Sequence, residues 1–423
     1  MTQKAAFAEL YTPKLVSVLR EGYGAKAFKA DALAGLTVAI VALPLSMAIA
    51  IGSGAKPEHG LFSAVVGGFI ISALGGSRFQ IGGPAGAFIA LVATTIARFG
   101  FDGFLLATLM AGFILLAIGY LRLGSLIRHI PHPVLTGFTA GIAIIIFSGE
   151  IRDLLGLSLV HEPAELIERL PALWEARGTA NPAAIAMSAF CFAIMLGLRK
   201  IAPRFPGLLA AVVLAGFGVW ALGLPVETIG TKFGGIPNAL PVPSIPKGDL
   251  DRMIELLPSA IAIALLGGME SLLSAVVADG MSGRQHRSNC ELVAQGYANI
   301  ACALFGALCA TGTIARTATN IRAHAHGPVA GMLHSLFLLG FMMLAAPLAS
   351  YVPLAALAAV LGLVAWNMIE KETIAALFRH DKAAASVVAL TFLLVIFVDL
   401  IAGIAAGAVL GLILQRTGHL KAH

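Results

Sequence analysis

Glu270 is the residue whose type and position most directly suggest chemistry. It lies near the centre of an apolar segment, IAIALLGGMESLLSAVVA. An ionised carboxylate deep in a membrane is costly unless it is paired or hydrated, and such residues typically mark ion or proton pathways. Gly267 and Gly268 stand just before it and would let backbone or a ligand come close. We interpret Glu270 as a coupling-ion residue, and the alternative is an acid that stabilises one helix contact.

Arg316 is the complementary charge. It lies one turn into a short helix that Thr311, Gly312 and Thr313 open. The start of a helix presents free N–H groups and a partial positive charge, and Arg316 adds a fixed cation. Together they form the kind of seat that helix starts provide for anions.

A second helix start matches the first. It is Gly82-Gly83-Pro84-Ala85-Gly86, with the proline in a favourable first-turn position. Small residues there would let a ligand touch the backbone, although close helix packing explains a glycine run equally well. Several hydroxyls could donate hydrogen bonds to an oxyanion or coordinate a cation, and for each one a bond to its own helix is the alternative; they belong to Ser46, Ser271, Ser274, Thr313 and Thr317.

The two starts belong to a repeated pattern. FQIGGPAGAFIALVATTIA (Phe79–Ala97) and CATGTIARTATN (Cys309–Asn320) lie about 230 residues apart. Each follows another interrupted apolar segment, the first containing Pro44 and the second Gly267-Gly268 and Glu270. We read this as an internal repeat of broken helices. Paired short apolar segments of this kind point to a transporter site at the bilayer midplane.

The composition predicts that these residues belong to a membrane protein. The chain is 58% hydrophobic and 12% charged, with a mean hydropathy of +0.91, whereas soluble domains are about 25% charged. Segments of about 20 residues can each cross a bilayer. We count about fourteen, seven in each half: 31–53, 60–75, 82–98, 102–121, 131–149, 182–198, 205–223, 254–278, 288–308, 311–323, 328–350, 353–369, 383–399 and 400–416.

Charge distribution predicts the orientation. With both termini in the cytoplasm, most of the 28 Lys and Arg residues fall in inner segments, as the positive-inside rule requires. The net charge of +6 therefore implies no nucleic-acid partner. No cleavable signal peptide is visible, and the four cysteines lie in apolar segments without CxxC spacing, which favours packing over metal or redox use.

The expected organisation follows from these segments. Residues 1–30 form a cytoplasmic lead-in, 31–223 the first repeat, 224–251 a Pro- and Gly-rich outer crossover, 252–416 the second repeat, and 417–423 a cytoplasmic tail. Between Glu150 and Pro182, apolar residues at helical spacing predict a pair of surface helices on the outer face.

Three stretches resemble the SulP sulfate-permease family of anion transporters. They are PEHGLFSAVVGGFIISALGGSRFQIGGPAGA (Pro57–Ala87), GGMESLLSAVVADGMSG and TGTIARTATNIRAHAHGPVAG, and the resemblance runs from about residue 30 to 416. It implies an all-α membrane fold of fourteen segments in two inverted repeats of seven, with a core domain (spans 1–4 and 8–11), a gate domain (spans 5–7 and 12–14) and two half-helices entered by short extended strands. Relatives usually continue into a cytoplasmic STAS domain. None is recognised in this sequence, either because the sequence stops short of it or because this member lacks it, and no regulatory partner is predicted.

The resemblance also implies a site between the two half-helix starts, closed by spans 1 and 8. Carried over by position, the substrate-binding residues are Pro44, Gly83, Pro84, Ala85, Gly86, Thr313, Ile314, Ala315 and Arg316, and the coupling-ion residues are Glu270 and Ser274. Sodium-linked relatives tend to have Asp where this chain has Glu270, which favours protons over sodium.

We therefore expect a secondary active anion transporter in a bacterial plasma membrane, working by alternating access and coupled to protons. The expected substrate is a small oxyanion or dicarboxylate: fumarate-like, sulfate or bicarbonate. The alternatives are a nucleobase permease of the same fold and an uncoupled anion channel or exchanger. Motifs of membrane enzymes such as HExxH and GxSxG are missing, so we expect no enzyme activity, cofactor or metal. Expected partners are the anion, the coupling ion, the bilayer and a second copy of the chain.

Overall fold

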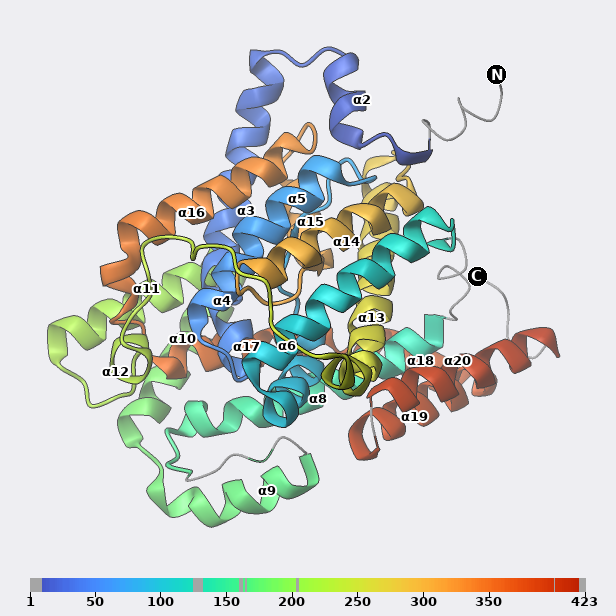
Figure 1. The fold of residues 1–423 in the computed structure, drawn as a ribbon. Coiled ribbons are helices and arrows are strands. Elements are labelled where there is room, and N and C mark those ends of the chain that lie inside the picture. The colour runs from blue at the N-terminus through green and yellow to red at the C-terminus, as the bar shows by residue number, and fades with distance from the viewer. Residues whose placement is uncertain are drawn as a thin grey trace, which may run out of the picture.

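The protein is described here by a computed structural model that covers residues 10–124, 132–159, 163, 166–202, 205–398 and 400–417. Residues 1–9 of the expected lead-in and 418–423 of the expected tail lie outside these ranges. The described residues are mostly helical, as expected for an all-α membrane fold (Figure 1).

Eight stretches of helix in the described residues are long and apolar enough to cross a membrane. Three lie in the first hundred and twenty residues: α3 (Ala25–Gly52), the run of α4 (Pro57–Phe62), η1 (Ser63–Gly67) and α5 (Gly68–Leu74), and η2 (Gly86–Phe88) with α6 (Ile89–Tyr120). The other five are α8 (His132–Leu155), α10 (Pro182–Ile201), α13 (Leu250–Ser282), α16 (Val329–Ala349), and α17 (Leu354–Met368) with α18 (Lys371–His380).

Shorter helices complete the described fold. Three are apolar: α11 (Gly207–Leu222), α19 (Lys382–Phe397) and α20 (Leu400–Arg416). Another, α14 (Ser288–Leu304), carries buried polar side chains. The remaining elements are α2 (Lys14–Arg20), α9 (Leu166–Glu175), η3 (Ala176–Thr179), α12 (Ile229–Phe233) and α15 (Ile314–Arg322).

Two buried strands of two residues each pair with one another, and we call them the crossing strands. β1 (Gly82–Gly83) pairs antiparallel with β2 (Thr311–Gly312), Gly82 opposite Gly312 and Gly83 opposite Thr311. Each strand leads directly into a helix: β1 into η2 and α6, and β2 into α15. The backbone at Gly100 leaves helical geometry (φ 73°, ψ 172°), so α6 consists of two parts. We call η2 with residues 89–99 the first half-helix, and α15 the second.

Two segments that the sequence predicted to be broken are continuous. Pro44 lies inside α3, and Gly267 and Gly268 lie inside α13. The idea of broken helices is therefore wrong for these two segments and applies only to the two half-helices. Proline lacks an N–H and so removes one helical hydrogen bond, which a membrane helix packed against neighbours tolerates.

The helices fall into two packed groups. In the first, α14 and α13 pack along α6, and α16 packs along α3. In the second, α19 and α17 pack along α8, α20 lies against α19, and α10 lies against α11 and α17. The groups meet where α17 and α11 contact α3. Figure 1 shows α2 at one end of the molecule and α9 at the opposite end.

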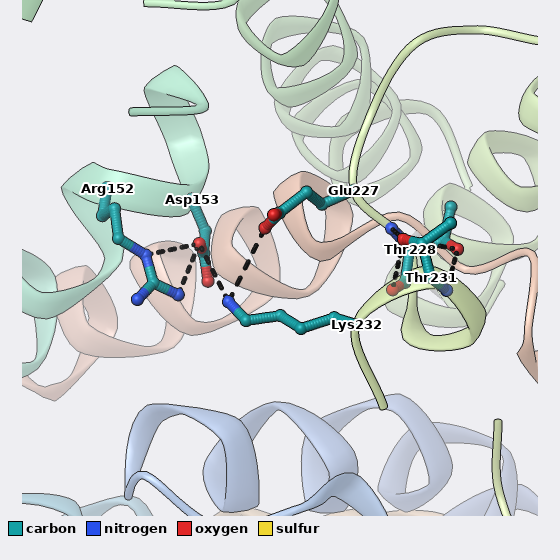
Figure 2. Close-up of polar contacts among 6 residues, drawn as sticks. All are labelled: Arg152, Asp153, Glu227, Thr228, Thr231 and Lys232. Atoms are coloured by element: carbon teal, nitrogen blue, oxygen red, sulfur yellow. Dashed lines mark hydrogen bonds and ion pairs between the residues drawn. The ribbon is translucent and has the colours of Figure 1, made fainter. Parts of the chain in front are cut away.

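The segment between α11 and α13 is irregular apart from α12. A capping box between Thr228 and Thr231 starts this short helix, and Thr228 forms an isolated bridge with Pro353 ahead of α17. Figure 2 shows Asp153 of α8 between Arg152 and Lys232, with Lys232 also facing Glu227. The crossover is thereby joined to both α8 and the start of α17.

The expected pair of surface helices between Glu150 and Pro182 is wrong for the described residues. There, α8 continues to Leu155 and α9 is the only separate α-helix among the described residues of the segment, followed by the four-residue 3₁₀ helix η3. Leu173 of α9 is buried, whereas Ile167, Leu170 and Trp174 are exposed. One amphipathic helix thus lies on this surface of the molecule.

Candidate functional site

Arg316 lies at the junction of the crossing strands and α3. Its side chain is buried, with 2% of the residue exposed. Nη2 donates to Ser46 Oγ at 3.1 Å and to the Pro84 carbonyl oxygen at 3.3 Å. Among the described residues, neither Nε nor Nη1 has a hydrogen-bond acceptor. Burial of unpaired guanidinium donors is costly, so this corner of the molecule suits an added acceptor.

Gly83 leaves the space that the guanidinium occupies. A Cβ added there would lie 2.4 Å from Arg316 Nη1, and the backbone φ of +153° is one that side chains rarely adopt. The following residues, Pro84 and Ala85, are buried, and Ala85 is extended before η2 begins. The glycine is therefore needed both for the turn of the chain and for the approach of Arg316.

Both half-helix starts present backbone donors. Thr313 precedes α15 and is tied to β1, because its N–H and Oγ1 both donate to the Ile81 carbonyl oxygen at 2.9 and 3.2 Å. The N–H groups of Ile314 and Ala315 then lie at the helix start, where helices lack internal acceptors, and both residues are exposed. Gly86 and Ala87 occupy the same positions in the first half-helix.

Glu270 lies close to this cluster. The residue is half-buried, and its Oε2 atom is buried without a hydrogen-bond partner among the described residues. Its charge and that of Arg316 are close enough to interact, but the two side chains form no direct ion pair. Each of the two side chains therefore keeps unused hydrogen-bonding capacity.

The other expected residues lie around this centre. Ser274, one turn after Glu270, is fully buried and donates to Thr317 Oγ1 at 3.1 Å, which joins α13 to α15. Pro44 is buried and lines an apolar cavity of about 450 Å³ between α3, α11 and α16. Gly86 is half-buried, and a Cβ added there would be 3.6 Å from Met368 Sδ in the second helix group. The structure thus brings Arg316, Gly83, Pro84 and Glu270 together, whereas Pro44 and Gly86 lie toward the second group.

A buried polar stripe on α14 was missed by reasoning from the sequence. Glu291, Gln295 and Asn299 are at most 2% exposed, and their four-residue spacing inside an apolar helix was the signal that could have found them. Asn299 accepts from the Ala310 N–H at 2.9 Å and donates to the Ala310 carbonyl oxygen at 2.8 Å. Gln80, also buried, donates to Glu291 Oε1 at 2.9 Å. The stripe therefore contacts the segments that lead into both crossing strands.

Arg78 ties the chain before β1 to the end of the molecule that carries α2. It donates to Glu21 Oε2 at 2.6 Å and to the His326 carbonyl oxygen at 2.9 Å. This contact holds the pKa of the Glu21 carboxyl below its usual value. Asp31 accepts from the N–H groups of His326 and Gly327. The chain after α15 is thereby fixed to α3.

Comparison with known proteins identifies the class. Residues 28–391 match the sulfate permease family. The putative sulfate transporter YvdB of Bacillus subtilis (strain 168) is 43% identical over 395 residues, which cover 93% of this chain and 74% of that protein. Among solved structures, the transmembrane domain of a cyanobacterium bicarbonate transporter, BicA, superposes with a TM-score of 0.81 at 28% identity, covering 90% of this chain and 98% of that one.

A third comparison bears on the fold alone. The structure of SLC26A9 superposes with a TM-score of 0.88 at 18% identity, over 99% of this chain and 69% of that one. The protein is thus of the anion-transporter class that these helices and relatives define. The chain belongs to the sulfate permease family, which confirms the resemblance seen in the sequence.

Proposed function

We propose that this protein carries a small anion across a membrane and binds it between the two half-helix starts. The observation that carries the proposal is Arg316: a buried guanidinium whose Nε and Nη1 lack acceptors among the described residues. It stands beside helix starts that supply further N–H donors and positive dipole ends. A neutral nucleobase would leave that charge uncompensated, so the rival permease function is not favoured.

Transport would proceed by alternating access of the first helix group, as a core domain, against the second, as a gate domain. The antiparallel pairing of β1 with β2 supports two inverted repeats of seven segments, since repeats of opposite orientation bring equivalent strands together in this way. We propose that both termini lie in the cytoplasm of a bacterium. The segment with α9 and α12 would then face outward.

The substrate class follows from the donors. One guanidinium and two sets of backbone N–H groups suit a compact oxyanion or a small dicarboxylate, and we propose sulfate, bicarbonate or a fumarate-like anion. Relatives named as sulfate and bicarbonate transporters support the first two. A homodimer is a further proposal.

We propose that Glu270 couples transport to protons. An anion arriving at Arg316 would cancel part of the positive field that favours the ionised carboxylate, and so would favour protonation. Because such coupling is reciprocal, protonation would in turn tighten anion binding, and proton and anion would cross together. The alternative is coupling to sodium. In that case Ser274 and other oxygen atoms near Glu270 would bind the cation.

Purified protein in liposomes tests the function. Uptake of radiolabelled sulfate, bicarbonate and fumarate would be measured with and without an inward proton gradient, in sodium and in choline buffers. We expect gradient-driven uptake of at least one anion that is insensitive to sodium. Uptake at channel rates would favour the uncoupled alternative, and a strict sodium requirement would replace the proton with a cation.

The variant Glu270→Gln separates binding from coupling. It should still bind and exchange the anion, since a neutral side chain mimics the protonated acid, but it should lose accumulation driven by the gradient. Glu255→Gln, the same change at an exposed position of α13, is the matched control. Concentrative uptake equal to wild type in Glu270→Gln would contradict proton coupling through this residue.

A further inference from the structure

Glu291 accepts hydrogen bonds from α13, from its own helix and from the chain that leads into β1. It is completely buried near the start of α14. Its Oε1 atom accepts from Gln80 Nε2 at 2.9 Å, from Gln295 Nε2 at 3.1 Å and from Ser271 Oγ at 3.4 Å. Its Oε2 atom accepts from the Ser77 N–H at 3.0 Å. No basic side chain pairs with it in the described part of the chain, so hydrogen bonds alone offset the burial of this carboxylate.

We propose that Glu291 is a positioning residue of the anion site, which it never touches: it fixes both half-helix starts and Glu270 relative to one another. The inference rests on the proposed function, since the site it positions is the proposed anion site.

The first route runs through Gln80 to Arg316. Gln80 packs directly over β2, because a Cβ added to Gly312 would lie 1.8 Å from Gln80 Nε2. The next residue, Ile81, accepts from Thr313 and donates its N–H to Thr317 Oγ1 at 3.1 Å. Thr313 and Thr317 flank Arg316 in the first turns of α15. A shift of Gln80 would therefore move the helix turn that carries the guanidinium.

The second route runs through Ser271 to Glu270. Ser271 is fully buried and accepts from Gln80 Nε2 at 2.6 Å while it donates to Glu291 Oε1. It directly follows Glu270 in α13, so it fixes the rotation of the helix at the carboxylate. Both charges of the proposed site thus depend on the same three-residue network of Gln80, Ser271 and Glu291.

As the side chains lie in the structure, each partner of the two Glu291 oxygens donates a hydrogen bond to them, so the network suits a carboxylate. Glu291→Gln keeps the shape but replaces one oxygen with an NH₂ group. At the Oε2 position that group would oppose the Ser77 N–H, and at the Oε1 position the amides of Gln80 and Gln295 would have to turn over, which breaks the bonds they make in the structure. Donors left without an acceptor in a buried site force a displacement. The expected displacement is that of the chain leading into β1.

The experiment compares anion affinity and turnover in purified variants. Affinity for sulfate, bicarbonate and fumarate would be measured by anion-dependent thermal stabilisation, and KM and maximal rate by uptake into liposomes. We expect Glu291→Gln to weaken affinity and raise KM about tenfold, as loss of a hydrogen bond to a charged group would, with a smaller change in maximal rate. Ser271→Ala should weaken affinity severalfold. Glu255→Gln is the control.

A double variant tests whether Glu291 acts through Ser271. If it does, Glu291→Gln with Ser271→Ala weakens affinity by less than the product of the single effects. A merely structural role would lower the melting temperature and leave affinity unchanged, and that result would overturn the proposal. Should Glu291→Gln fail to fold, wild-type affinity in Ser271→Ala would overturn it instead. Absence of binding in the wild type would refute the anion site itself, whereas binding unaffected by both variants refutes only the positioning role.

Discussion

Replacement of Arg316 by alanine is the most direct test of the anion site. The side chain supplies the only charged donors at the two half-helix starts among the described residues, and Nε and Nη1 lack acceptors. Truncating one partner of a buried, hydrogen-bonded charge pair costs about 2–5 kcal/mol. At about 1.4 kcal/mol for each factor of ten, anion affinity should fall between about 30-fold and several thousand-fold. Loss of the bonds to Ser46 and Pro84 adds a smaller effect on stability.

Arg316→Lys refines the estimate. Lysine keeps the charge but offers one nitrogen where arginine offers three in a fixed fork. One ammonium group cannot reach Ser46 Oγ, the Pro84 carbonyl oxygen and an anion in the geometry that the guanidinium has. We therefore expect affinity between those of wild type and Arg316→Ala.

The assay is binding and uptake of the transported anion by monodisperse protein. Arg322→Ala is the matched control, since Arg322 lies on the same helix and its side chain is exposed; it should behave as wild type. The site assignment is refuted if Arg316→Ala binds the anion with wild-type affinity. If instead both alanine variants, Arg316→Ala and Arg322→Ala, lose activity and aggregate, the loss reflects misfolding. Arg316→Lys is then the variant that tests the site.

Two further predictions concern the strand crossing and the orientation. Gly83→Ala should abolish high-affinity binding in a folded protein, because its Cβ would lie 2.4 Å from Arg316 Nη1; unchanged affinity would show that the guanidinium has room to move. All four natural cysteines are buried, so an impermeant maleimide applied to intact cells should label Val242→Cys, which is highly exposed, and leave Arg284→Cys unlabelled. The reverse labelling pattern would invert the proposed topology.

The helix interruptions could be predicted because they depend on local chemistry. Gly82-Gly83 and Thr311-Gly312 are poor helix residues in apolar surroundings, and both become short extended strands. The sequence also predicted separate segments on either side of residues 99–101, where Gly100 leaves helical geometry. By contrast, Pro44 was expected to interrupt its segment. Whether this proline interrupts the helix depends on the packing of neighbouring helices against it, and the local sequence does not show that packing.

The buried polar residues that support the site from α14 could not be predicted in the same way. Glu291 is the fourth residue of α14, and an acid in the first turn of a helix is ordinarily explained by the helix dipole. Its actual partners, Ser77, Gln80 and Ser271, come from segments about 200 residues earlier and from the preceding helix. Only the tertiary fold brings them together. The spacing of Glu291, Gln295 and Asn299 indicates a buried face, but it does not reveal what that face holds.

The pairing of Gly82 with Gly312 has a consequence for how the protein is made. Chains grow at about 5–20 residues per second, so roughly 10 to 50 seconds separate the synthesis of the two strands. Throughout that interval the backbone groups of Gly82 and Gly83 lack their partners, and unpaired groups are poorly tolerated in hydrocarbon. These groups of the first half of the chain therefore stay unpaired with protein until the second half is made. Folding of the first half of the chain would then depend on the synthesis of residues 311–312, which the anion site also needs.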